Sequence, residues 1–487
     1  MVRNFTQQVL FRAIGMIASV LTVSATTRYM GPSSYGALTT AVMFVALWTS
    51  LTELGIGQVV VRRVMSGKGE LERLIRVNVG MSTMYCLPLF ALTAISGALI
   101  YRNDSDIVEM VVIVAVGLII TTMTSCFGPI FLVTVRFGAV ALSDLLSRVG
   151  SLGATLVLIH FGAGTVWFAI VMLVPPLIVL LIQGVAAARI TNWRPVFALG
   201  ESWELLREGL PLTAMLIVGV LYWRVDGVIL SLLGTTDQVG VYGLAYTVTF
   251  TLTALSAFFL SSTLSAMVHA FAQNRDEFIR FTARSVESML FAGAPIAVVG
   301  AILANQIVEL VGSDEFVSHG GPTVALLSVA VALTFLTGVL SQALFAAHDQ
   351  SFLVRLSLAN LILNIVLNIV LVPLYGAVGS GIALVATEVS GLVFASWRLS
   401  RLVPYRTPWV FLLRLLVPLA ACAAIAESMR HLPVLLTLGV TVVLYLLVNL
   451  AVGPADAKLI KTLFSKRTDT DALDRDPEPE IRQATSP

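Results

Sequence analysis

Hydrophobic stretches follow one another almost without interruption from Thr6 to Val452, about fourteen in number. A helix needs roughly 20 apolar residues to cross the hydrocarbon core of a bilayer, and most of these stretches reach that length. Charged residues make up only 12% of the chain, whereas soluble domains carry roughly 25%. The sequence therefore predicts an all-α polytopic membrane protein.

The hydrophobic pattern places the membrane helices at 6–27, 36–60, 78–100, 107–134, 140–161, 164–188, 210–232, 239–268, 286–311, 322–346, 353–373, 378–398, 408–428 and 434–452. Basic residues collect in alternate connecting loops. If the N-terminus lies in the cytoplasm, the outer loops hold only Arg28, Arg102 and Arg430. The inner loops hold Arg62, Arg63, Lys68, Arg73, Arg76, Arg136, Arg189, Arg194, Arg207, Arg275, Arg280, Arg284, Arg398, Arg401 and Arg406. This asymmetry is typical of the positive-inside rule and predicts that both termini are cytoplasmic.

An internal repeat indicates how the helices are organised. Residues 30–37 and 233–244 each join the end of one long helix to the start of the next, and both contain a Gly turn and a Tyr-Gly pair. The two segments are six helices apart, which preserves orientation and predicts two pseudo-symmetric six-helix lobes. We divide the chain into an N-lobe (1–190), an amphipathic cytoplasmic linker (191–209), a C-lobe (210–400), two added helices (401–453) and a largely disordered cytoplasmic tail (454–487).

The loops and cysteines argue against an enzyme. Each predicted outer loop has about ten residues or fewer, too few to hold a catalytic domain. The inner loops contain no paired carboxylates in a Gly-rich setting and no His/Cys cluster. Cys86, Cys126 and Cys422 all fall inside predicted helices, so neither a disulfide nor a metal site is expected. We predict a transporter with no catalytic residue, no metal and no nucleic-acid partner.

Charged side chains at membrane depth are the candidate functional residues. Each costs roughly 2.5–3.5 kcal/mol if it faces lipid at the bilayer centre, so each needs a partner or water. The set comprises Arg12, Arg148, Arg224, Glu53, Asp144, Asp226 and Glu388. Asp144 and Arg148 are four residues apart, which predicts a local ion pair.

Arg224 and Asp226 are two residues apart, on different faces of one helix, so each needs a partner elsewhere. Arg224 faces either an anionic substrate or an acid such as Glu53. Arg12 lies near the inner end of its helix and either meets substrate or extends to the interface. Asn360, Asn364 and Asn368 share one helix face, where they either bond to a neighbouring helix or line a cavity.

Several motifs resemble a known family. They are Arg28-Tyr-Met-Gly-Pro-Ser-Ser-Tyr-Gly36, Leu51-Thr-Glu-Leu-Gly-Ile-Gly57, Val61-Arg-Arg63, Arg224-Val-Asp226, Val239-Gly-Val-Tyr242, Leu371-Val-Pro373 and Tyr375-Gly-Ala-Val-Gly379. Together they resemble the polysaccharide transporter (Wzx-type) oligosaccharide flippases of the MOP (multidrug/oligosaccharidyl-lipid/polysaccharide) superfamily. The resemblance extends over the first twelve helices.

The resemblance implies a multi-pass protein of the bacterial cytoplasmic membrane that moves a polyprenyl-diphosphate-linked oligosaccharide from the inner to the outer leaflet by alternating access. By position, Arg12, Arg224 and Arg148 would meet the diphosphate, and Tyr242, Tyr246 and Asn364 would line the sugar path. Glu53, Asp226 and Glu388 would couple transport to a proton or sodium gradient, without a cofactor. Membrane lipid and other polysaccharide-assembly proteins are the expected partners.

Three alternatives remain open from the sequence. A cation-coupled multidrug-type exporter would use the same architecture. A lipid II flippase-like protein would usually carry several cations and an adjacent Arg-Asp pair in its first helix, where this chain has only Arg12. A non-transporting membrane scaffold would recruit cell-wall enzymes through its tail.

Overall fold

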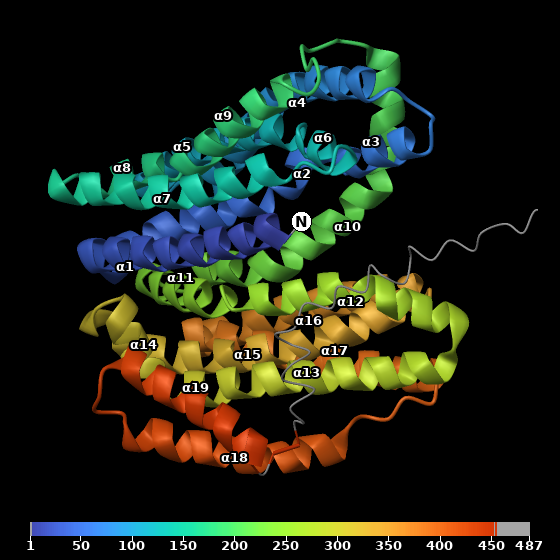
Figure 1. Cartoon of the computed structure of the whole chain (residues 1–487). Coiled ribbons are helices and arrows are strands. Elements are labelled where there is room, and N and C mark those ends of the chain that lie inside the picture. Colours follow the sequence, from blue (N-terminus) through green and yellow to red (C-terminus); the bar gives the residue numbers. More distant parts are fainter. Residues whose placement is uncertain (1, 452, 455–487) are drawn as a thin grey trace, which may run out of the picture.

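The described residues are entirely helical and loop, as the sequence predicts. The computed structural model describes residues 2–451, 453 and 454, with side chains at residue 11 and from residue 14 onward (Figure 1). No strand occurs in this part of the chain, and 13 of its helical segments are long and apolar enough to cross a membrane. One of these segments, Ile14–Met65, has 52 residues and contains most of the first predicted helix and all of the second. The all-α, multi-pass prediction is confirmed.

The first helix, α1 (Val2–Leu47), is a hairpin of two membrane helices. It reverses at Gly31, whose φ of 71° lies in the left-handed region that glycine adopts without strain. Before the turn, Ser19 bonds to Arg148 in the middle of α7 (Gly138–His160), and the Tyr29 hydroxyl reaches the Ala163 carbonyl just beyond the end of α7. After the turn the chain runs back along the lobe toward α2 (Figure 1).

The N-lobe is completed by short and long helices that follow α1. They are α2 (Ser50–Glu53), α3 (Ile56–Met65), α4 (Leu71–Ile100), α5 (Ser105–Ser125), α6 (Gly128–Val133), α7, α8 (Thr165–Val171) and α9 (Val174–Ala188). Apolar side chains from the second half of α1, α4 and α5, such as Phe44, Leu89 and Val111, form one of its two cores. The predicted second helix is thus divided into three pieces, with breaks at Trp48–Thr49 and Leu54–Gly55.

The C-lobe has the corresponding set of helices. They are α10 (Leu199–Leu233), α11 (Thr236–Phe250), α12 (Thr253–Gln273), α13 (Arg275–Ile302), α14 (Ala304–Val311), α15 (Asp314–Ala346), α16 (Gln350–Tyr375) and α17 (Ala377–Leu402). A capping box between Thr235 and Gln238 starts α11, the repeat counterpart of the second half of α1. Residues 199–209, which the sequence assigned to the linker, form the first turns of α10 because nothing in that segment interrupts the helix.

The last two helices lie outside the twelve-helix arrangement, as predicted. Helices α18 (Trp409–Ser428) and α19 (Val434–Ala451) pack on α13 and α14 at the far side of the C-lobe (Figure 1). Their contact includes a polar bond, because the buried Tyr445 hydroxyl donates to the Phe291 carbonyl at 2.8 Å. The predicted disordered tail falls, from residue 455 onward, outside the described residues.

The two repeated turns predicted from the sequence lie against each other. A Cβ atom on Gly36 would overlap the Thr236 carbonyl, and a Cβ atom on Gly240 would overlap the Pro32 carbonyl. Beside them, the Arg28 guanidinium donates to the Glu309 and Leu310 carbonyls at the end of α14, at 3.0 and 2.8 Å. The lobes therefore meet at this end through closely packed backbone.

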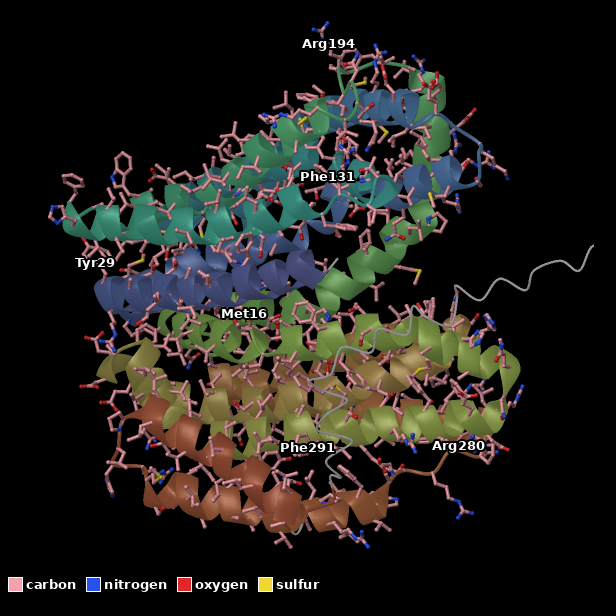
Figure 2. All side chains as sticks on the ribbon, viewed as in Figure 1. Met16, Tyr29, Phe131, Arg194, Arg280 and Phe291 are labelled. Atoms are coloured by element: carbon pink, nitrogen blue, oxygen red, sulfur yellow. The ribbon has the colours of Figure 1, made fainter. Side chains whose placement is uncertain are left out.

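At the opposite end the lobes diverge, and α10 connects them (Figure 1). The beginning of α10 is bound to the N-lobe through Glu208, which bonds to Arg62 at 2.6 Å and Arg63 at 2.5 Å. The second half of α10 packs on α11 and α16 of the C-lobe. Arg194 and Arg280 lie toward this diverging end, away from Tyr29 (Figure 2). That this end faces the cytoplasm stays a prediction of the loop charges.

Candidate functional site

Arg224 lies in the C-terminal half of α10 and forms no ion pair with a described acidic residue. Its side chain is half-buried, and its guanidinium carbon lies 5.2 Å from the centre of the Tyr246 ring. Within the described part of the chain it forms neither an ion pair nor a hydrogen bond. A cation–π contact offsets only part of the cost of removing a guanidinium from water. Arg224 therefore keeps donors available for an anion.

Aromatic side chains gather beside Arg224. The Tyr246 ring stacks on Phe250 with centroids 4.1 Å apart and an angle of 7° between the planes, and Trp223 meets Phe250 edge-on at 5.4 Å. Tyr222 contacts Trp223 at 5.1 Å. Of this group only Tyr246 was predicted from the sequence as a site residue, although Tyr222 and Trp223 directly precede Arg224 in the chain. The result is an aromatic surface next to an unpaired cation.

Asp226 and Tyr242 form a buried pair inside the C-lobe. Tyr242 is fully buried and its hydroxyl donates to one Asp226 carboxylate oxygen, while the Gly227 N–H donates to the other at 2.8 Å. Arg224 and Asp226 form no ion pair with each other among the described contacts, as their spacing predicts. Their surroundings still adjoin, because the Arg224 charge acts on the Asp226 carboxylate and the Tyr246 ring beside Arg224 lies 6.1 Å from the Tyr242 ring. In this conformation Tyr242 is enclosed by packed side chains, so it reaches a sugar only if the lobes rearrange.

Glu388 of α17 is buried among hydroxyl groups. Tyr222 of α10 donates to its Oε1 and Thr337 of α15 donates to its Oε2, both at 2.9 Å. No basic side chain pairs with it in the described residues. A buried carboxyl group held only by hydroxyls can exist with or without its proton, which is what a coupling group requires.

The asparagine face of α16 is buried, and one of its three members bonds to the neighbouring helix. Ser390 of α17 donates to Asn360 at 3.0 Å, and Asn368 donates to the Asn364 side chain at 3.0 Å. Asn364 Nδ2 and Asn368 Oδ1 have no partner among the described atoms. Asn364 is fully buried here, and its assignment to the sugar path stays a prediction.

Arg148 of the N-lobe forms the ion pair expected from its spacing. Its Nε lies 3.2 Å from an Asp144 carboxylate oxygen, four residues earlier, and its Nη1 donates to the Ser19 hydroxyl of α1 at 2.8 Å. Its side chain is 37% exposed, so the pair leaves guanidinium donors free. The Arg12 side chain lies outside the described residues, and its contact with a diphosphate stays a prediction.

Glu53 faces a polar cavity in the N-lobe. It ends α2, and the next two residues, Leu54 and Gly55, both have left-handed φ values of 49° and 64°. The cavity, of about 440 Å³, is lined by Thr49, Ser50, Thr52, Glu53, Thr121, Thr124, Ser125, Gly128, Gln183, Leu216 and Val220. Glu53 has no ion pair in the described chain, and it is the only charged residue in this lining. Thr121, Thr124 and Ser125 of α5 were not predicted as site residues, because no pattern in the sequence indicates that they face Glu53.

The candidate residues therefore form separate groups in this conformation. Arg224, Tyr246, Asp226 and Glu388 lie on or around α10 in the C-lobe. Glu53 and Arg148 belong to the N-lobe, and the cavity of Glu53 is closed on one side by Leu216 and Val220 of α10. Helix α10 thus carries or contacts candidate residues of the C-lobe and also borders the Glu53 cavity of the N-lobe.

The sequence is similar to a known protein family and to one of its curated relatives. Residues 26–319 match the family described as polysaccharide biosynthesis protein. The lipopolysaccharide biosynthesis protein WzxC of Escherichia coli (strain K12) is 23% identical over 235 residues, which cover 48% of this chain and 47% of WzxC. The aligned part thus spans about half the length of that relative.

Two solved structures share the fold. Lipid II flippase MurJ in an inward closed conformation has a TM-score of 0.77 and 13% identity, with 92% of this chain and 98% of that chain covered. An inward-facing multidrug resistance MATE family transporter of the MOP superfamily has a TM-score of 0.65 and 15% identity, with 80% and 95% covered. The family match, extending over more than half of the sequence, shows that this chain is a multi-pass membrane member of the polysaccharide biosynthesis protein family, with the fold of the MOP superfamily transporters.

Proposed function

We propose that this protein moves a polyprenyl-diphosphate-linked oligosaccharide from the inner to the outer leaflet of the bacterial cytoplasmic membrane. The observation that carries the proposal is Arg224, a half-buried cation without an acidic partner among the described residues. A lone cation at this depth costs about 2.5–3.5 kcal/mol or more unless an anion or water compensates it. A diphosphate supplies that charge, and the guanidinium fork fits phosphate oxygens.

The surroundings of Arg224 suit the rest of such a substrate. Aromatic faces, here Trp223, Tyr246 and Phe250, pack well against the apolar faces of sugar rings, and tyrosine hydroxyls bond to sugar hydroxyls. A lipid tail needs no enclosed cavity because it can remain in the bilayer. The aromatic surface beside Arg224 therefore supports a sugar diphosphate as cargo.

The arrangement of the lobes supports alternating access. The lobes are held together at the end of the Gly31 turn by the Gly36–Gly240 contact and diverge at the other end. The loop charges predict that the diverging end faces the cytoplasm, where lipid-linked sugars are assembled. Transport then requires the Gly36–Gly240 contact to open, driven by proton or sodium binding at Glu53, Asp226 or Glu388.

Direct binding tests the role of Arg224. The purified protein should bind a polyprenyl-diphosphate-linked disaccharide at least about tenfold more tightly than its Arg224→Ala variant, because a hydrogen bond to a charged group contributes roughly 1.5–3 kcal/mol. Arg224→Lys should recover part of the affinity, since it keeps the charge and loses the fork.

Arg430→Ala is the matched control, because Arg430 follows α18 and is bound to Glu427 of that helix and to the Ile302 carbonyl at the end of α13. Thermal unfolding of each variant should show that the fold is retained. The proposal would be contradicted if wild type and Arg224→Ala bound the diphosphate-linked disaccharide with equal affinity. It would also be contradicted if the wild-type protein bound a monophosphate-linked sugar as tightly as the diphosphate-linked one. Preferential binding of organic cations would favour the exporter alternative instead.

A further inference from the structure

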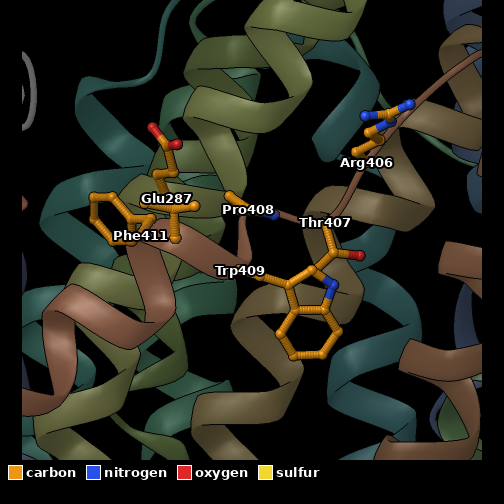
Figure 3. Close-up of a pocket in the computed structure, with 7 residues that line it drawn as sticks. Glu287, Arg406, Thr407, Pro408, Trp409 and Phe411 are labelled. Atoms are coloured by element: carbon orange, nitrogen blue, oxygen red, sulfur yellow. The ribbon is translucent and has the colours of Figure 1, made fainter.

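A second cavity lies where the C-lobe meets the added helices (Figure 3). It has a volume of about 550 Å³ and lies between α13, the loop that follows α17 and the first turn of α18. Its lining residues are Glu287, Arg406, Thr407, Pro408, Trp409, Val410 and Phe411. No site residue predicted from the sequence belongs to this group.

The cavity carries one acidic and one basic side chain that are not bonded to each other. Neither Glu287 nor Arg406 has an ion pair or hydrogen bond with another described residue, although the charge of Arg284, three residues earlier on α13, acts on Glu287 without a direct bond. The nearby Arg398, in contrast, is paired with Asp349 at 2.6 Å. In Figure 3 the Glu287 carboxylate and the Arg406 guanidinium stand on either side of Thr407 and Pro408. The cavity therefore offers both an acceptor and a set of donors to one occupant.

The cavity lies at the edge of the hydrocarbon region. Helix α18 has 20 residues, so it is about 30 Å long and just spans the bilayer core. Its first residue, Trp409, marks one boundary, where tryptophan and arginine are enriched. Trp409 and Val410 are 64% and 65% exposed. An occupant can therefore enter sideways from the lipid at headgroup level.

We propose that this cavity binds the headgroup of a zwitterionic phospholipid that carries a primary ammonium, as phosphatidylethanolamine does. The ammonium donates hydrogen bonds to the Glu287 carboxylate, and the phosphate accepts from the Arg406 guanidinium. A choline headgroup lacks the N–H donors that Glu287 needs. An anionic headgroup leaves Glu287 unpaired and is repelled by it.

Such a lipid would connect α13 to the start of α18. Its headgroup would join Glu287 of the C-lobe to the loop that leads into the added helices, and its tails would lie along Trp409 and Val410. Bound lipid should therefore stabilise the contact between the C-lobe and α18. This proposal does not depend on which substrate the protein transports.

Lipid retention measured by native mass spectrometry tests the site. The full-length protein is delipidated in detergent and then mixed with equal amounts of phosphatidylethanolamine, phosphatidylcholine and phosphatidylglycerol of the same chain composition. We expect phosphatidylethanolamine to be retained about tenfold over the other two, because charge-assisted hydrogen bonds are lost with either competitor. Glu287→Gln and Arg406→Gln should each remove this preference, and Glu287→Asp should keep part of it.

Glu427→Gln is the matched control, since Glu427 lies at the other end of α18 and is paired with Arg430. Each variant's thermal unfolding midpoint shows whether it has folded. Equal retention of the three lipids by the wild-type protein would overturn the proposal. Preferential retention of phosphatidylglycerol that requires Arg406 but not Glu287 would also overturn it.

Discussion

Two buried carboxyl groups in the C-lobe accept hydrogen bonds from hydroxyls or a backbone N–H and form no ion pair within the described residues. Asp226 accepts from Tyr242, and Glu388 accepts from Tyr222 and Thr337. Salt bridges are present elsewhere in the described chain, as at Arg148 and Asp144. The chain therefore leaves these two acids able to gain or lose a proton, or to bind a small cation, without breaking an ion pair.

Glu388→Gln separates a structural role of this residue from a coupling role. Glutamine keeps an oxygen that can accept from Tyr222 or Thr337, but it cannot ionise. We expect the thermal unfolding midpoint to change by only about 2 °C, because most of the hydrogen bonding is kept. Transport driven by an imposed proton or sodium gradient should fall by about tenfold or more.

Gradient-driven transport in proteoliposomes is the measurement, with Glu427→Gln as a surface control. If Glu388→Gln transports normally under both gradients, Glu388 only supports the packing of α10, α15 and α17. If it fails to fold, Glu388→Asp shows whether a titratable group at this position restores transport.

The second membrane helix of each lobe is broken, as are the spans Ser105–Val133 and Thr165–Ala188. In the N-lobe it is broken at Trp48–Thr49 and Leu54–Gly55, and in the C-lobe it is broken at Thr251–Leu252. Both helices also begin in the Gly36–Gly240 contact. Breaks inside a membrane helix leave backbone carbonyls that need other partners, and here Thr52 accepts from both Tyr85 and Ser125. These elements are suited to bending during transport.

Adding a methyl group at Gly240 should open the contact between the two turns. The new Cβ would overlap the Pro32 carbonyl, and such overpacking costs roughly 1–3 kcal/mol. Because the cost falls only on the state in which the turns meet, Gly240→Ala should shift the population toward states that are open at this end.

Spin-label distances across that end can measure the shift. Labels at the exposed positions Phe161 and Tyr375 belong to different lobes, and their mean separation should increase in Gly240→Ala. Gly439→Ala is the control, because a Cβ there meets no atom within 4 Å. An unchanged distance distribution in Gly240→Ala would show that this contact does not hold the lobes together.

At the scale of the whole molecule, the arrangement of helices follows from the sequence because membrane insertion depends on local hydrophobicity. The spans, the two added helices and the repeated turns of Gly36 and Gly240 were all predictable from spacing and composition. The Asp144–Arg148 pair was predictable for the same reason, since four residues bring two side chains together on one helix.

Contacts between distant segments were not predictable in this way. Tyr222 and Glu388 are 166 residues apart in the chain, and no local pattern indicates that they bond. The helix breaks near Thr49 and Thr251 occur in spans with a mean hydropathy of 1.5, close to the 1.4 of the unbroken helix Gly138–His160, so hydropathy alone does not indicate a break. Glu287 was not predictable as a site residue, because the residues that share its cavity lie in and after the loop that follows α17.

The most direct test of the account is transport of the lipid-linked sugar itself. Proteoliposomes should carry a polyprenyl-diphosphate-linked, fluorescent disaccharide on one leaflet, with the wild-type protein, Arg224→Ala or Arg430→Ala reconstituted at equal density. We predict that the sugar reaches the other leaflet with wild type and Arg430→Ala, and at least about tenfold more slowly with Arg224→Ala. Transport by Arg224→Ala at the wild-type rate would contradict the claim that this unpaired arginine receives the diphosphate.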